Sequence, residues 1–280
     1  MPGNPQIALV NVVKLNIAGQ KGISPNDINN HGQVVGMFTD ANSVNHGFLY
    51  DSGAFAQLDY PGATNTSANG INNLGQIVGS FLDANNKSHG FVYNAGNFSS
   101  AINCPGAAFT DAMGINDFGL VVGSCGKLGG IDSSGFIYNN GGLQLFNAPN
   151  TNMPTPTTVF GDINDGGQVV GFFWIKEINH GTSFLYNPNV FTPPLDYPYG
   201  GPPIQNGTTL RGINNRGHIV GTFNNPNIPI PFVFSAGTCY QIVVPGASAA
   251  SAAGINDYAQ IVGFFRDASG ENGYLATLAV

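Results

Sequence analysis

Short runs of alternating apolar and polar residues recur along the whole chain, and turns rich in asparagine and glycine separate them. The clearest recurring segment reads Gly-Ile-Asn-Asn/Asp-x-Gly-Gln-Ile/Val-Val-Gly and occurs six times with local variations. Its copies are centred on Ile28, Ile71, Ile115, Ile163, Ile213 and Ile255, at spacings of 43, 44, 48, 50 and 42 residues. Alternation with a period of two indicates strands. A fixed repeat of this length predicts one supersecondary unit copied in series, as in propellers.

The second copy shows the unit most clearly. Its pattern predicts four short strands, at residues 68–72, 76–81, 89–93 and 97–103. The first turn ends at Gly75, which can adopt a positive φ, and a polar loop at 83–88 joins the second strand to the third. Pro105 ends the fourth strand because proline cannot donate to the ladder. Four antiparallel strands without helical periodicity are typical of one propeller blade.

The two ends of the chain predict how the ring closes. The last copy stops after a third strand at 272–275, whereas the chain begins with a strand that has no preceding three. Leu15 lies 13 residues before Ile28, the offset that separates Leu58 from Ile71. The N-terminal strand is therefore in register to complete the last blade and to remove the exposed edges. An open solenoid is the alternative, but it needs polar capping repeats, which the sequence lacks.

We therefore predict an all-β, six-bladed β-propeller with four antiparallel strands per blade, forming a single domain over residues 1–280. The expected blades span about 25–60, 68–104, 112–148, 160–197, 210–244 and 252–276, with an N-terminal strand at about 10–17 in the sixth.

The longer pattern HGF…PGA…GIN…GQIVG resembles the extracellular HAF-repeat proteins over essentially the whole chain. The histidine of this pattern stands at His46, His89 and His180, and is replaced by Ser134, Ile230 and Asn272 in the other copies. The resemblance implies the repeat architecture and an extracellular location, and it implies little about activity.

Charge and hydropathy exclude some partners. Only 8% of residues are charged, the formal net charge is −7, and the eight basic residues are scattered. Nucleic acids and anionic membranes need clusters of Lys and Arg, so we expect neither as a partner. No segment approaches the roughly 20 apolar residues that span a bilayer. We expect a secreted or extracytoplasmic protein whose export signal, if any, is already removed, because the N-terminus lacks signal-peptide features.

The three cysteines form no disulfide framework. Cys104 and Cys125 could pair between adjacent repeats, but the sequence favours free buried thiols.

Variable loops direct attention to the fourth blade. The short turns between strands one and two, and three and four, lie on one face of the ring, and the variable connections lie on the other. The insertion entering blade four contains Met153 and Phe160, and the insertion leaving it contains Tyr197 and Tyr199. The only tryptophan, Trp174, lies between them and is followed by Lys176. We predict a ligand pocket under these segments, although neutral loop growth with aromatic side chains covering the blade is the alternative.

The innermost strands carry a second departure from the repeat. The residue before the motif isoleucine is Gly in four copies but Asp27 and Asp162 in two, which lie opposite each other across the axis. The residue before that is Asn26, Asn69, Met113, Gly161, Arg211 or Ala253. A carboxylate near a narrow channel needs a partner, and Arg211 could supply it for Asp162. The pair could polarise a ligand or transfer a proton, or it could be a buried ion pair that stiffens the wall.

Other polar repeats favour structural roles. The six asparagines Asn29, Asn72, Asn116, Asn164, Asn214 and Asn256 are expected to cap their own turns. Asp40, Asp83 and Asp267 lack the clustered calcium-loop pattern, so a loop cap or an Asp–His contact within the blade is favoured. We expect His218, which replaces a repeat Gln, to serve packing, and we expect neither a metal nor a cofactor because no histidines have zinc-ligand spacing.

Two functions remain open. The first is a binder, or a cofactor-free natural-product cyclase of the hetero-Diels–Alder type, that positions a small apolar or aromatic molecule in the channel mouth. By architecture alone the chain resembles the propeller-type hetero-Diels–Alderases of tropolone–terpenoid pathways. In this hypothesis Arg211, Asp162 and Lys176 are catalytic, and Trp174, Phe160, Tyr197, Tyr199, Met113, Asn69 and Asp27 bind substrate. The alternative is a secreted glycan- or protein-binding module without catalysis. The sequence leaves the oligomeric state open.

Overall fold

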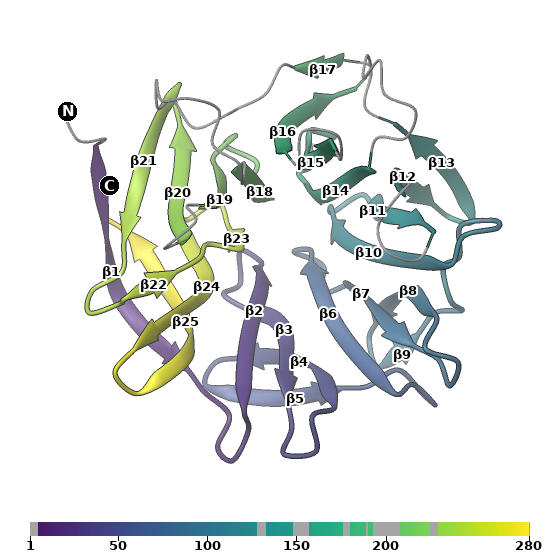
Figure 1. Cartoon of the computed structure of the whole chain (residues 1–280), viewed down its shortest axis with the longest axis horizontal. Helices are drawn as coiled ribbons and strands as arrows, with labels where there is room; N and C mark the ends of the chain where they lie inside the picture. Colours follow the sequence, from purple (N-terminus) through teal and green to yellow (C-terminus); the bar gives the residue numbers. More distant parts are fainter. Residues whose placement is uncertain are drawn as a thin grey trace.

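The computed structural model describes residues 5–127, 133–147, 157–175, 180–188, 190–192, 208–224 and 229–279. The strands are arranged as six blades around a central axis, with the first strand of each blade innermost (Figure 1). Hydrogen bonds between neighbouring blades join some of them, so the sheets have nine, eight, four and four strands. The described part of the chain contains strands and no helix. The predicted six-bladed, all-β propeller is confirmed.

The strands follow the repeat. Blades one to three consist of β2 (Gly22–Ile28), β3 (Val34–Thr39), β4 (Asn45–Asp51) and β5 (Ala54–Leu58), then β6 (Asn65–Ile71), β7 (Ile77–Leu82), β8 (Ser88–Asn94) and β9 (Asn97–Phe98), then β10 (Phe109–Ile115), β11 (Val121–Gly126), β12 (Ser133–Asn139) and β13 (Gly142–Phe146). Blades four and five consist of β14 (Thr157–Ile163), β15 (Val169–Ile175), β16 (His180–Asn187) and β17 (Val190–Thr192), then β18 (Thr208–Ile213), β19 (Ile219–Asn224), β20 (Pro229–Ser235) and β21 (Thr238–Val243). Blade six consists of β22 (Ala249–Ala250) and β23 (Gly254–Ile255) in place of one inner strand, then β24 (Gln260–Asp267), β25 (Gly270–Leu278) and the N-terminal β1 (Gln6–Leu15).

The N-terminal strand closes the ring as the repeat spacing predicts. Strand β1 pairs antiparallel with β25, with Lys14 opposite Tyr274 and Leu15 opposite Gly273 (Figure 1). Lys14 Nζ also lies 2.6 Å from Asp267 Oδ2. The first residues of β1 pair in parallel with β21 of blade five, so β1 joins the last two blades. Strand β1 thus supplies the outer strand of blade six, so that this blade has no strand missing at its edge.

The core lies between neighbouring blades and is dominated by one aromatic position of the third strand. This ring is 0–2% exposed in every blade and belongs to Phe48, Phe91, Phe136, Phe184, Phe232 and Tyr274. Burial of each such ring contributes roughly 1.5–3 kcal/mol. A glycine of the second strand makes room for it: a Cβ on Gly79 would lie 2.0 Å from the Ser67 carbonyl oxygen and 2.7 Å from the Phe91 ring.

One end of the channel is closed by the Gly-Ile-Asn turns, and we call it the Asn-turn end. Each of the six turn asparagines accepts backbone N–H bonds within its own turn, as Asn72 does from Leu74 (3.1 Å) and Gln76 (2.9 Å). This confirms the predicted capping role. Each also donates through Nδ2 to the same asparagine's carbonyl in the next blade, at 2.9–3.2 Å, and Asn256 returns the bond to Asn29. The turns therefore form a closed hydrogen-bonded ring.

A second ring of hydrogen bonds lies beside the first. The residue after each asparagine accepts the backbone N–H of its counterpart in the preceding blade, at 2.7–2.9 Å. Its members are Asn30, Asn73, Asp117, Asp165, Asn215 and Asp257. The two rings satisfy buried backbone groups that would otherwise destabilise the channel.

The prediction of free thiols at Cys104 and Cys125 is wrong, because the two form a disulfide. The reason is visible at the preceding junction. There Tyr60 and Phe81 occupy the matching positions, and their rings stack with centroids 3.7 Å apart. The repeat thus places these two positions in direct contact across each junction, and two cysteines there are close enough to bond. Cys239 is free and buried.

Within the described residues, none forms a helix with the length and hydropathy that a membrane span requires.

Candidate functional site

The channel wall opposite the Asn-turn end is set by a β-bulge in each inner strand. The strand register shifts by one residue in blades one to five. The extra residues are Asn26, Asn69, Met113, Gly161 and Arg211, and Ala253 holds the same place between β22 and β23. A bulge re-aims a side chain away from the regular alternation. The six bulge residues therefore differ from blade to blade while the surrounding strands stay alike.

Arg211 is the only charged bulge residue, and it is exposed. It has no hydrogen bond or ion pair with any described residue. Its neighbours at the bulge position are small, Gly161 in blade four and Ala253 in blade six. Partial desolvation inside the ring lowers the pKa of Arg211 from its ordinary value, although a guanidinium stays charged at neutral pH. The fold thus holds an unpaired positive charge in the channel.

Arg211 borders a cavity of about 190 Å³ at the end of the channel formed by the connections between second and third strands and between blades, which we call the loop end. Blades five, six and one line this loop-end cavity with Ser24, Pro25, Asn26, Thr209, Arg211, Thr222, Pro229, Ser251, Ala252, Ala253 and Phe264. The described lining residues supply hydroxyls, one amide, one cation and one aromatic ring, and no carboxylate.

Thr222 is the second unusual feature of the loop-end cavity. Its side chain is only 6% exposed, and its hydroxyl has no hydrogen-bond partner. It lies on β19 opposite Thr209 on β18, the strand that carries Arg211. A buried hydroxyl without a partner costs about 1–3 kcal/mol, so it marks a place where a bound molecule would recover a hydrogen bond.

The predicted ion pair between Asp162 and Arg211 is wrong. Asp162 accepts backbone N–H bonds from Ile163 (2.8 Å) and Ile213 (2.9 Å) and lines a separate cavity of about 50 Å³ at the Asn-turn end. Arg211 lines the loop-end cavity instead. The bulge is the physical reason, because it turns Arg211 toward one end while the next inward residue faces the other.

Asp27 occupies the same position as Asp162 across the axis. It accepts N–H bonds from Ile28 (2.8 Å) and Ile71 (2.9 Å), so each carboxyl links two adjacent blades. Burial raises the pKa of Asp27 to about 7. Burial and the nearby Asp27 charge raise the pKa of Asp162 well above its ordinary value. Within the described ranges, no three His, Cys, Asp or Glu side chains are grouped to hold a metal ion.

Asn69 and Met113 lie on the channel wall as bulge residues of blades two and three. Asn69 Nδ2 donates to the Ala112 carbonyl (2.8 Å) and lies 3.8 Å from Met113 Sδ. Asn26 likewise donates to the Ala68 carbonyl (2.9 Å). On this side of the ring the bulge residues contact one another, whereas Arg211 stands between two small ones.

The residues predicted around blade four fall in three groups. Phe160 is a core residue with 0% exposure, packed against Phe146 and Phe184, so its assignment to ligand binding is wrong. Trp174 pairs through its backbone with Thr157 on β14. Lys176, Tyr197 and Tyr199, as well as Met153, lie outside the described residues, and their roles stay predictions.

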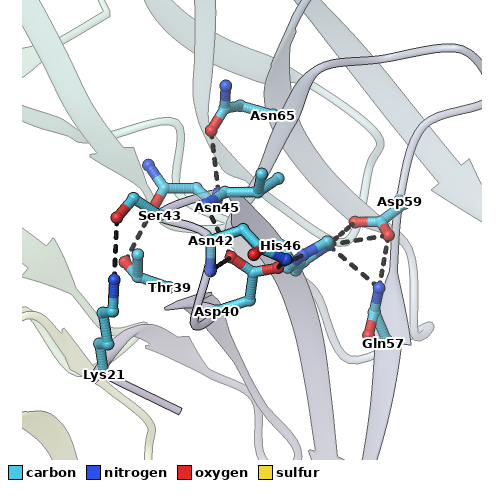
Figure 2. Close-up of polar contacts among 11 residues, drawn as sticks. Lys21, Thr39, Asp40, Asn42, Ser43, Asn45, His46, Gln57, Asp59 and Asn65 are labelled. Carbon is cyan, nitrogen blue, oxygen red and sulfur yellow. Dashed lines mark hydrogen bonds and ion pairs between the residues drawn. The ribbon is translucent and has the colours of Figure 1, made fainter.

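The repeated aspartates and histidines form contacts on the rim of the blades. His46 Nδ1 lies 3.0 Å from Asp59 and its Nε2 lies 3.7 Å from Asp40 (Figure 2). Asp40 also caps its loop by accepting N–H bonds from Asn42 and Val44, both 2.8 Å. In blade two, His89 Nε2 lies 3.3 Å from Asp83. The predicted loop caps and Asp–His contacts are confirmed, and these polar groups are partnered within the protein.

A further cavity of about 320 Å³ lies between blade five, β1 and the last residues of β25. Ile7, Val233, Tyr240 and Leu278 line it together with His218. His218 Nδ1 lies 3.4 Å from Asn214 Nδ2, the contact that the repeat Gln makes in other blades, which agrees with its predicted packing role. This cavity offers few polar groups to orient a ligand.

Most residues of the loop-end cavity were missed from sequence. They occupy repeat positions, two residues before the bulge and one residue after the second-strand glycine, where the pairs are Ser24/Met37, Ser67/Ser80, Asp111/Ser124, Val159/Phe172, Thr209/Thr222 and Ser251/Phe264. These positions vary among the six copies, although the preceding glycine is present in all six and the following residue is Phe in five, with Cys125 in the other. That variation was the available signal.

Comparison with known proteins supports the fold. No family model matches the chain, and no curated protein matches its sequence. Aleuria aurantia lectin, described as having a six-bladed β-propeller fold and a novel fucose recognition mode, matches with a TM-score of 0.52 and 12% identity over 98% of this chain and 94% of that one. AofleA from Arthrobotrys oligospora matches with a TM-score of 0.55 and 11% identity over 95% and 81%. Pyrococcus horikoshii acylaminoacyl peptidase matches with a TM-score of 0.54 and 12% identity over 91% of this chain and 43% of that one. Likeness at these identities establishes the propeller fold alone, which a lectin and a peptidase share.

Proposed function

We propose that this protein is a binding propeller that holds one small polar ligand, a saccharide unit, in the loop-end cavity beside Arg211, without catalysing a reaction. The observation that carries the proposal is the unpaired Arg211 and the unpaired, buried Thr222 hydroxyl on one cavity wall. At the Asn-turn end, by contrast, the described turn asparagines and the two aspartates are hydrogen-bonded within the protein. The buried Thr222 hydroxyl is a cost to the free protein that a ligand offsets, and the exposed Arg211 guanidinium is free to bind the same ligand.

The chemistry and size of the cavity suit a sugar. Ser24, Asn26 and Ser251 add hydroxyl and amide groups, and Phe264 adds an apolar ring. A volume of about 190 Å³ is below the roughly 300–1,000 Å³ of pockets for drug-sized ligands, so one ring-sized unit is the natural occupant. The fucose-recognising lectin from Aleuria aurantia shows that this fold is used for saccharide binding, which supports the proposal by analogy.

A cyclase is less well supported. The described residues that line the loop-end cavity include no carboxylate and no histidine, so none of them offers a general base beside Arg211. Asp162, the partner expected from sequence, lies at the other end of the channel. The proposed site therefore binds and orients but has no described group for proton transfer.

An extracytoplasmic location is part of the proposal. The Cys104–Cys125 disulfide supports it, because such bonds persist mainly in oxidising compartments. The resemblance to the extracellular HAF-repeat proteins points the same way.

The test is a glycan screen followed by titration calorimetry on the hits. We expect one saccharide per chain, since the six blades present six different sets of side chains at the loop end. Ala253→Leu, which places bulk beside Arg211, should abolish binding. Ala56→Leu, an exposed change on β5, should leave binding unaltered. Binding that survives Ala253→Leu, or several equivalent sites per chain, would contradict the proposed site.

A further inference from the structure

The charge inside the loop-end cavity defines the class of ligand more narrowly than the proposed function does. The chain carries a formal charge of −7. Among the residues that the structure describes, the cavity nevertheless is lined by one cation, Arg211, and by no anion. A neutral sugar would leave that charge without a counterion, whereas an anionic sugar would neutralise it.

The position of Arg211 makes it available to a ligand and not to the protein. It is a bulge residue, and its two neighbours around the ring, Gly161 and Ala253, have no side chain long enough to cover it. The carboxyls of Asp27 and Asp162 accept four backbone N–H bonds near the Asn-turn end. They are thus committed elsewhere, and the Arg211 guanidinium keeps its donors free for a planar, two-oxygen acceptor.

Thr222 supplies an independent sign that this wall is built for a ligand. Its hydroxyl is buried and without a partner, and it lines the same cavity as Arg211 from the adjacent strand. Hydroxyls of this kind donate to or accept from sugar hydroxyls. Pro25 of blade one and Phe264 of blade six also line the cavity and offer apolar contact to the ring.

We propose that the loop-end cavity selects an acidic saccharide, with the carboxylate of a hexuronate-type unit seated on Arg211 and a ring hydroxyl bonded to Thr222. This inference rests on the proposed saccharide-binding function. A sulfated sugar presents a related anion, but its tetrahedral group matches the planar guanidinium less closely than a carboxylate does. The experiment separates the two.

The experiment is calorimetric titration of the protein with methyl glucuronide, methyl glucoside and glucose 6-sulfate, repeated on four variants. We expect the glucuronide to bind at least tenfold more tightly than the glucoside, and the sulfate to lie between them. Arg211→Gln should remove the preference, and Arg211→Lys should restore only part of it because the two-pronged contact is lost. Thr222→Val should weaken the glucuronide and the glucoside together, by about fivefold. Arg216→Gln, the same change of charge in an exposed turn at the Asn-turn end, should change neither.

The outcomes distinguish the two proposals. Equal binding of glucuronide and glucoside, unaffected by Arg211→Gln, overturns the acidic-saccharide inference while saccharide binding stands. Tighter binding of the sulfate than of the glucuronide overturns the carboxylate assignment. If none of the three sugars binds, acetate and benzoate are titrated while the Arg211 Hε resonance is followed by NMR. A saturable shift of that resonance keeps the anion site and removes the saccharide, and no shift overturns both.

Discussion

At the Asn-turn end of the channel each blade contributes the same two positions, an Asn followed by an Asn or Asp, to closed rings of hydrogen bonds. At the loop end the six blades contribute six different sets of side chains. Asn72 and its five counterparts repeat one geometry at 2.9–3.2 Å around the first ring. Arg211 has no charged counterpart among the bulge residues of the other blades, and neither Arg211 nor the Thr222 hydroxyl has a hydrogen-bond partner among the described residues. Repetition thus marks the part of the molecule that closes the fold, and its breakdown marks the part where we propose that a ligand binds.

The largest expected change follows from breaking the repeated end. Asn72→Ala removes two acceptor bonds within its turn and one donor bond to Asn116 of the next blade. Because the site is buried, we expect a loss of about 3–5 kcal/mol in the free energy of unfolding, measured by denaturant titration. Asn97→Ala, at an exposed turn, should stay within about 0.5 kcal/mol of wild type. Equal effects of the two changes would show that the ring does not hold the blades together.

The loop end also contains a stabilising contact between blades, the Cys104–Cys125 disulfide that links blades two and three. It closes a segment of 21 residues, so its removal in the Cys104→Ala/Cys125→Ala variant should cost about 3 kcal/mol. Thermal melts would record this as a lower Tm. Dithiothreitol should lower the Tm of the wild type and leave the double variant unchanged. Three titratable thiols in the denatured, unreduced wild type would contradict the bond.

A smaller effect is expected from pH at the Asn-turn end. The folded pKa of Asp27 is about 7, above its unfolded value of about 3.9, so the native state binds more protons between these values. The contribution of Asp27 therefore makes stability fall as pH rises from about 4 to 7. His218, whose pKa is lowered by burial, acts in the opposite direction over part of this window. Comparison of wild type with Asp27→Asn isolates the carboxyl: the variant should show a shallower fall, and a steeper one would contradict the assignment.

The smallest effect on stability is expected at Arg211. A buried ion pair that loses one partner typically costs 3–5 kcal/mol, but Arg211 has no described partner. Arg211→Gln should therefore change the unfolding free energy by no more than about 0.5 kcal/mol, as measured in denaturant. A loss of several kcal/mol would contradict this account and favour the buried ion pair that was predicted from the sequence.

The repeat predicted the fold closely because its signals are local and recur. The 13-residue offset between Leu15 and Ile28 predicted that the N-terminal strand completes the last blade, and β1 does pair with β25 there. The directions of the side chains that line the channel were harder to predict, because the β-bulge in each inner strand determines which end of the channel a side chain faces. Asp162 and Arg211 hold neighbouring positions in the repeat and yet face opposite ends of the channel.

Contacts between blades were also hard to predict, because the sequence of a single repeat does not show which of its residues meet the next repeat. Phe160 entered the predicted site because it lies beside an insertion, but the strand register places it in the core. The Cys104–Cys125 bond becomes predictable only when the two positions are compared with Tyr60 and Phe81 at the previous junction.

A crystal structure of the protein soaked with methyl glucuronide tests the central claim most directly. We predict one sugar per chain in the loop-end cavity, with its carboxylate on the Arg211 guanidinium and a hydroxyl within hydrogen-bond distance of Thr222. Sugar bound at several blade junctions, with the loop-end cavity holding only water, would contradict it.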